Sequence, residues 1–223
     1  SSMSKGWHPK GLLNRAADGL SGLSGVSVET SRPHETITLE ASGSRLEVLY
    51  LRQPGGGEFA VEVDGEEIER IGTEGETGPG FWRRDLTPGL HSVALRTLSA
   101  GPVRIHGWVM ESPAGLTWET LGINGAQADL LLGWDPAVLK THVAHRDPAL
   151  ILLAYGTNEA RRLDWTMESY RQALEQVINL FREAAPAASI LVVGAPDQML
   201  RYSRSVAAVE RCLLYTSPSP RDS

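Results

Sequence analysis

The spacing of apolar residues changes near Pro113, and this change limits the possible folds more than any other feature of the chain. Before Pro113, short runs such as Arg45–Leu51 alternate between polar and apolar residues. After it, longer segments rich in leucine and alanine have apolar residues three and four positions apart. Alternation is typical of strands with one buried face, whereas the longer spacing is typical of helices. We therefore expect two regions with different architectures.

The first region is predicted to contain seven short strands separated by turns rich in glycine and proline. Asp64-Gly65 favours a two-residue hairpin turn, which would pair Phe59–Val63 with Glu66–Ile71 in antiparallel fashion. Pro88-Gly89 is expected to be another turn. Short strands in this number predict an antiparallel β-sandwich of two sheets over residues 26–112. Residues 1–25 are expected to be loop-like.

The second region, residues 113–211, is predicted to be an α/β layer, because strands and helices alternate along it. Leu150–Tyr155 is continuously apolar, as in parallel strands that are buried on both faces. Thr166 is placed to cap the helix that follows it. The predicted elements are strand Thr117–Leu121, helices Ala126–Leu132 and Pro136–Arg146, strand Leu150–Tyr155, helix Met167–Ala185 and strand Ser189–Val193.

Composition and charge exclude several classes of function. The net charge is -6 and no large cluster of lysine and arginine occurs, so we expect no nucleic-acid partner. Cys212 is the single cysteine, so neither a disulfide nor a cysteine-based metal site can be built within the chain. No apolar run reaches the roughly 20 residues that a membrane-spanning helix needs. We expect no metal and no organic cofactor.

Two glycine-containing segments carry the clearest chemical signal. Gly156-Thr157-Asn158-Glu159 follows a predicted buried strand, at the end where open α/β sheets bind ligands. Asn158 could there donate an amide N–H to a developing oxyanion. The other segment, Gly122–Ala126, follows a predicted strand and opens a helix, so that Gly125 could expose a second backbone N–H.

This ordered pair of segments resembles the second and third conserved blocks of the SGNH (GDSL-like) hydrolases over roughly residues 116–198. The resemblance implies a flavodoxin-like, three-layer α/β domain, of which this chain would hold a part. It also implies that Gly125 and Asn158 form an oxyanion hole. Two-domain carbohydrate and peptidoglycan O-acetylesterases of this family carry an additional sandwich, which would correspond here to a jelly-roll like that of carbohydrate-binding modules.

The sequence departs from the family pattern at the remaining two blocks. It contains neither the Gly-Asp-Ser of the nucleophile block nor the Asp-x-x-His of the last block. We therefore expect a fragment that lacks both ends of the parent domain and is itself nearly inactive. Ser112 is a weak alternative nucleophile, because no Gly-Asp precedes it and a proline follows it. Residues 212–223 resemble a non-native tail.

Structural roles compete with the functional ones. Asn158 could cap a loop or helix, and Gly125 could simply begin a helix. Glu159 is expected to be a helix-start charge. His142 and His145 could chelate a metal, but a surface pair on one helix is the preferred interpretation.

Two further residues are candidates for substrate binding. Trp82 lies at a loop edge, where an aromatic ring could stack on a sugar, whereas Trp108 is expected to fill the core. Asp197 follows a predicted strand and could line the crevice that holds Asn158.

The function predicted from sequence is a serine ester hydrolase acting on acylated carbohydrate or cell-wall glycan. The alternatives are a non-catalytic glycan-binding module on a degenerate hydrolase scaffold and an inert structural interaction domain. A periplasmic or secreted location is implied by the resemblance alone.

Overall fold

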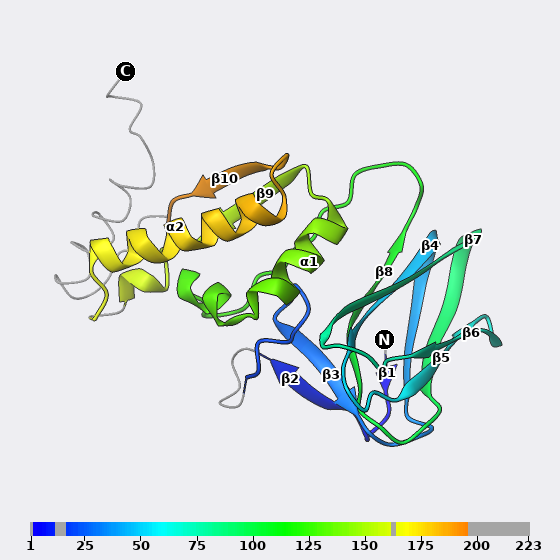
Figure 1. The fold of residues 1–223 in the computed structure, drawn as a ribbon. Helices are drawn as coiled ribbons and strands as arrows, with labels where there is room; N and C mark the ends of the chain where they lie inside the picture. The colour runs from blue at the N-terminus through cyan, green and yellow to red at the C-terminus, as the bar shows by residue number, and fades with distance from the viewer. Residues whose placement is uncertain (1, 12–16, 162–163, 196–223) are drawn as a thin grey trace. The chain divides into compact units, whose positions relative to one another are not determined.

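The computed structural model describes residues 2–11, 17–161 and 164–195 (Figure 1). The chain divides into two compact units after Leu121. We call residues 1–121 the sheet unit and residues 122–223 the α/β unit. The composition change at Pro113 lies upstream of this division. The structure is mostly antiparallel sheet with a few helices, which agrees with the predicted α/β class at this coarse level.

The described strands of the sheet unit form one hydrogen-bonded sheet of eight strands. Its order is β2-β3-β8-β4-β7-β5-β6, with β1 paired to β4. The bounds are β1 Ser2–Met3, β2 His8–Gly11, β3 Val26–Thr30, β4 Thr36–Arg52, β5 Glu58–Val63, β6 Glu66–Gly72, β7 Gly78–Thr97 and β8 Val103–Glu111.

Two long strands, β4 and β7, explain why one sheet forms where two were expected. They pair along their whole lengths, and their register shifts between Gly43 and Arg45. Gly89 pairs with Gly43, so the predicted turn at Pro88-Gly89 is wrong. Pro88 lies in the irregular part of the ladder, where its missing N–H breaks no regular pairing. A bulge bends the strands that contain it, so the sheet can curve instead of splitting.

The core of the sheet unit is a single cluster to which most of the strands contribute. Its members have exposures of 9% or less, and several are fully buried. A flat sheet would leave such residues open to water, so the curved sheet must cover its own inner face. The cluster consists of Trp7, Ile37, Leu46, Val48, Tyr50, Phe59, Val61, Val63, Ile71, Val93, Leu95, Val103 and Ile105.

The β5–β6 hairpin forms as predicted. Asp64 and Gly65 both have positive φ angles, 54° and 87°, as a two-residue type I′ turn requires. Strands β5 and β6 pair antiparallel on either side of it.

Residues 1–25, expected to be loop-like, contain the two strands β1 and β2. Strand β2 pairs antiparallel with β3. The buried Arg104 links Asp18, which lies between β2 and β3, to Glu29 of β3. Its Nη1 donates to Asp18 Oδ2 at 2.7 Å and its Nε donates to Glu29 Oε2 at 2.8 Å. These strands are too short to show a sequence period, so their pairing depends on long-range contacts.

The α/β unit is built around a parallel pair of strands, β9 and β10. Helix α2 begins with a capping box, in which Thr166 Oγ1 accepts from the Ser169 amide, as the sequence predicts. The predicted strand Thr117–Leu121, which precedes this unit, is not formed. The bounds are η1 Ala128–Gly133, α1 Pro136–Arg146, β9 Leu150–Ala154, η2 Glu159–Arg161, α2 Met167–Ala184 and β10 Ser189–Val193.

The two faces of the β9–β10 pair differ. On one face, Leu153 joins Tyr170, Leu174 and Val177 of α2 in a buried cluster. On the other face, Leu150, Leu152, Leu191 and Val193 are 40–48% exposed. The expectation that these strands are buried on both faces is therefore wrong for the described residues, and the three-layer arrangement stays a prediction. No helix in the described residues is long and apolar enough to cross a membrane.

Candidate functional site

The chain turns sharply after β9, within the α/β unit. Gly156 has a φ of +118°, in the region that favours glycine. Its carbonyl accepts from the Ala160 amide at 2.9 Å, which closes the turn. Asn158 is half-buried at the tip of this turn. The strand-end position predicted for Asn158 is therefore confirmed.

The Gly125 segment forms a separate β-turn. The Ala126 amide donates to the Ile123 carbonyl at 3.0 Å, and Gly125 occupies the third position with a φ of +78°. A type II turn requires a positive φ at this position, which is why glycine is suited to it. Among the residues that the structure describes, none accepts a hydrogen bond from the Gly125 amide. The helix expected from Ala126 is a 3-10 helix that begins at Ala128.

The structure brings the two segments together. The Asn158 Nδ2 donates to the Ala126 carbonyl at 2.7 Å, and the Gln127 Nε2 donates to the Asn158 carbonyl at 3.3 Å. A helix cap would instead require the Asn158 side-chain oxygen to accept an amide. A side-chain amide carries two hydrogens, so Asn158 retains a second donor beside the Gly125 turn. The hydrogen bond to Ala126 thus holds the Asn158 amide beside the Gly125 turn.

Glu159 makes the most extensive contacts of the site, and sequence reasoning missed them. Its exposure is 4%. Oε1 accepts from the Ala128 amide at 2.6 Å, and Oε2 accepts from the Gly156 amide at 2.9 Å. Burial raises the pKa of the neighbouring Tyr155, and the Glu159 charge raises it further. Glu159 does begin the short helix η2, as a helix-start charge would, but its carboxylate links two segments.

The histidines of α1 do not form the expected surface pair. His145 is exposed, but His142 is fully buried beside Val138, Leu139 and Val143 on the inner face of the helix. Burial lowers the pKa of His142 to about 4, and the nearby His145 contributes to the same shift. In the described part of the chain, no group of three or more His, Cys, Asp or Glu side chains could hold a metal ion.

The tryptophans and the remaining candidates lie elsewhere. Trp82 and Trp108 are partly buried and pack against the core of the sheet unit. Ser112 is exposed in the sheet unit, and Asp197 lies outside the described residues. The contact of Trp82 with sugar and the role of Asp197 stay predictions.

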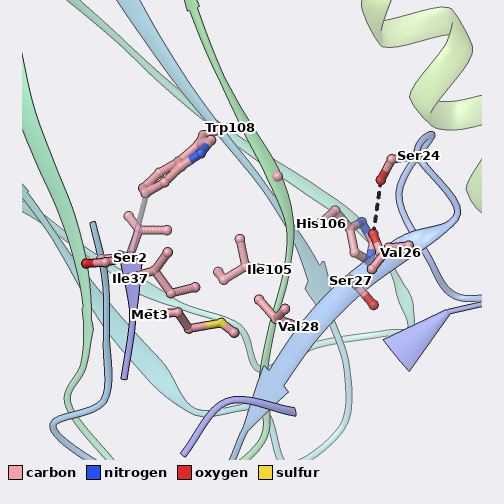
Figure 2. A pocket seen from close by; sticks show the side chains of 12 residues that line it. Ser2, Met3, Ser24, Val26, Ser27, Val28, Ile37, Ile105, His106 and Trp108 are labelled. Atoms are coloured by element: carbon pink, nitrogen blue, oxygen red, sulfur yellow. Dashed lines mark hydrogen bonds between the residues drawn. The ribbon is translucent and has the colours of Figure 1, made fainter. Parts of the chain in front are cut away.

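A hollow of about 440 Å³ lies within the sheet unit (Figure 2). Apolar side chains from β1, β3, β4 and β8, with Trp108 at one side, make up much of its lining. The Ser24 hydroxyl at its edge already donates to the Val26 carbonyl at 3.2 Å. Binding sites usually have a few convergent polar groups that orient the ligand. Ser2 Oγ and His106 Nε2 also hydrogen-bond to the protein itself, and among the described residues the buried Ser27 hydroxyl is a lining group without a partner. A single hydroxyl is too little to orient a ligand, so this hollow is a weaker candidate than the Gly125–Asn158 pair.

The sequence matches no protein-family model and no curated protein sequence. Its structure is similar to solved structures. A peptidoglycan O-acetylesterase superposes with a TM-score of 0.69 at 22% identity, over 95% of this chain and 61% of that one. The chain thus spans less than two thirds of the length of that structure. At this identity the similarity concerns the fold alone.

Two other solved structures are similar at a much lower level. A two-domain esterase active on acetylated mannans matches 40% of this chain and 28% of its own, with 16% identity and a TM-score of 0.34. A family two carbohydrate esterase from Clostridium thermocellum matches 92% of this chain and 82% of its own, with 14% identity and a TM-score of 0.34. Scores this low support no argument about fold or function.

Proposed function

We propose that this chain is part of an SGNH-type serine ester hydrolase and supplies its oxyanion hole. The observation that carries the proposal is the hydrogen bond from Asn158 Nδ2 to the Ala126 carbonyl, which sets Asn158 beside the Gly125 turn. The fold-level similarity to a peptidoglycan O-acetylesterase supports it. The substrate would be an acyl ester, namely an O-acetyl group on a carbohydrate or cell-wall glycan.

In this reaction a serine oxygen attacks the ester carbonyl, and the carbonyl oxygen becomes negatively charged. The Gly125 N–H and the Asn158 side-chain N–H would stabilise that charge. A single donor of this kind contributes about 3–4 kcal/mol to the transition state. The sequence contains no Gly-Asp-Ser. The proposal therefore assigns the nucleophilic serine and its histidine to polypeptide outside these 223 residues.

The test is hydrolysis of p-nitrophenyl acetate by the product of the complete reading frame that contains this chain. Asn158→Ala should lower kcat by roughly a hundredfold to a thousandfold. Asn179→Ala, which removes an exposed asparagine on α2, is the matched control and should leave kcat unchanged. An inactive complete protein, or equal rates for the two variants, would overturn the proposal.

The 223-residue chain alone provides a second comparison. We expect it to hydrolyse the ester no faster than its Asn158→Ala variant. Turnover that Asn158→Ala abolishes would place a nucleophile within the chain, and Ser112 would be the first residue to replace. Saturable glycan binding without hydrolysis by the complete protein would instead favour a glycan-binding module on a degenerate scaffold.

A further inference from the structure

Glu159 is a buried carboxylate between the two segments that carry the proposed oxyanion donors. Ala128, which donates to its Oε1, lies three residues after Gly125. Gly156, which donates to its Oε2, lies two residues before Asn158. One side chain thus connects the backbone on both sides of the proposed oxyanion hole.

The chemistry of this contact requires a carboxylate. An ionised carboxylate accepts hydrogen bonds on both oxygens, so each can face one backbone N–H. A glutamine of the same shape would turn an NH₂ group toward one of the two amides and lose that bond. An aspartate keeps the charge but is one methylene shorter, so it cannot reach both segments without movement of the backbone.

We propose that Glu159 is a positioning residue that holds the Gly125 turn and the Asn158 turn at the spacing an oxyanion requires. This inference rests on the proposed function. Glu159 acts through its two amide partners and does not contact the substrate. A role as a general base is disfavoured, because the residue is 4% exposed and both oxygens are already engaged by amides.

The same contacts permit a plainer role, in which Glu159 only stabilises the fold. Loss of a purely stabilising contact lowers the melting temperature but leaves the kinetics of the folded molecules unchanged. Loss of a positioning contact lowers kcat in molecules that remain folded, because misplacement of a catalytic group by about 1 Å can cost roughly a hundredfold in rate. The two roles therefore differ in their kinetics.

The first arm of the test measures whether Glu159 holds the Ala128 and Gly156 amides, and it requires no catalysis. Amide hydrogen exchange is followed at Ala128 and Gly156 in the unmodified protein, in Glu159→Gln and in Glu159→Asp. We expect exchange at one or both amides to accelerate by roughly tenfold to a hundredfold. Glu175→Gln alters an exposed glutamate of α2 and should change neither amide. Unchanged exchange in both Glu159 variants would mean that Glu159 does not hold these amides, and the positioning role would be overturned.

The second arm uses the complete reading frame and p-nitrophenyl acetate. Glu159→Gln should lower kcat by roughly tenfold to a hundredfold with little change in KM. Glu159→Asp serves as the second variant if Glu159→Gln does not fold, and circular dichroism checks both. In an Asn158→Ala background the effect of Glu159→Gln should shrink, because the group that it positions is gone.

The outcomes separate the two proposals. A complete protein that hydrolyses nothing overturns the proposed function, and the positioning role is overturned with it. Amide exchange still shows in that case whether Glu159 holds the Ala128 and Gly156 amides. An active protein that loses turnover in Asn158→Ala but keeps its kcat in Glu159→Gln overturns the positioning role alone. Accelerated exchange together with a lower kcat and a preserved KM supports both.

Discussion

The sheet unit and the α/β unit bury their apolar residues in different ways. The sheet unit curves around one cluster in which Leu46, Phe59 and Val93 are fully buried. The α/β unit covers one face of β9 and β10 with α2 and leaves Leu152 and Leu191 exposed on the other. A curved antiparallel sheet can cover its own inner face, whereas a parallel pair needs a separate layer on each side. The first unit thus contains its own core, and the second has an apolar face with no cover in the described residues.

The units also differ in the histidines that they hold. In the sheet unit, His91 Nδ1 contacts Asp64 Oδ2 at 2.7 Å, and its Nε2 contacts the Thr87 carbonyl at 2.7 Å. Both partners are acceptors, so the pair of contacts favours the charged imidazolium. In the α/β unit, His142 is buried among apolar residues, which favours the neutral ring. These two histidines should therefore change stability with pH in opposite directions.

The largest expected effect comes from the closed core. Phe59→Ala removes a fully buried ring that packs against Tyr50, with centroids 5.5 Å apart. The free energy of unfolding of the sheet unit should fall by about 3–5 kcal/mol. Denaturant titration measures it, and Leu90→Ala, at a position 70% exposed, is the control. Equal effects for the two variants would mean that the core is not closed as described.

The second effect concerns His142, whose pKa burial lowers from 6.5 to about 4. The unfolded chain takes up a proton near pH 6.5 and the folded chain only near pH 4, so stability is lost as pH falls between these values. The full loss is roughly 3 kcal/mol. Urea titrations of His142→Gln should lack this pH dependence, and His145→Gln should keep most of it, because burial is the main cause of the shift. The same dependence of the unfolding free energy on pH in both variants would show that His142 is not its source.

Sequence reasoning succeeded where the deciding contacts are local. Asp64-Gly65 contains both residues of its turn, and Thr166 lies three residues from its capping partner. The prediction of a turn at Pro88-Gly89 failed, because proline and glycine occur in both turns and bulges. The pairing of Gly89 with the distant Gly43 places this segment inside a strand. Sequence reasoning missed the contacts of Glu159, because Ala128 is 31 residues away. The order of two motifs did predict that Asn158 and Gly125 lie near one another, while their oxyanion role stays a prediction.

The third effect is smaller and has the opposite sign. Hydrogen bonding to Asp64 raises the pKa of His91, and the bond to the Thr87 carbonyl adds to this. The folded sheet unit therefore holds a proton that the unfolded chain releases above about pH 6.5, so the stabilisation is lost as pH rises through the folded-state pKa. NMR titration of the His91 ring should give a pKa above the ordinary value of 6.5. A His91 pKa at or below 6.5 would contradict the pairing with Asp64.

The smallest effect on stability is expected at the open face of β9 and β10. Leu152→Ser changes a residue that is 40% exposed, so the free energy of unfolding should change by no more than about 0.5 kcal/mol. Its effect on association should be larger, because exposed apolar patches promote contact between molecules. Light scattering at increasing concentration should show less association in Leu152→Ser than in the unmodified chain. Leu116→Ser, at a residue 92% exposed outside this face, separates a specific effect of the face from a general gain in polarity. Equal association in both variants would mean that the open face of β9 and β10 does not drive contact between molecules, and the contrast between the two units would then have no consequence for association.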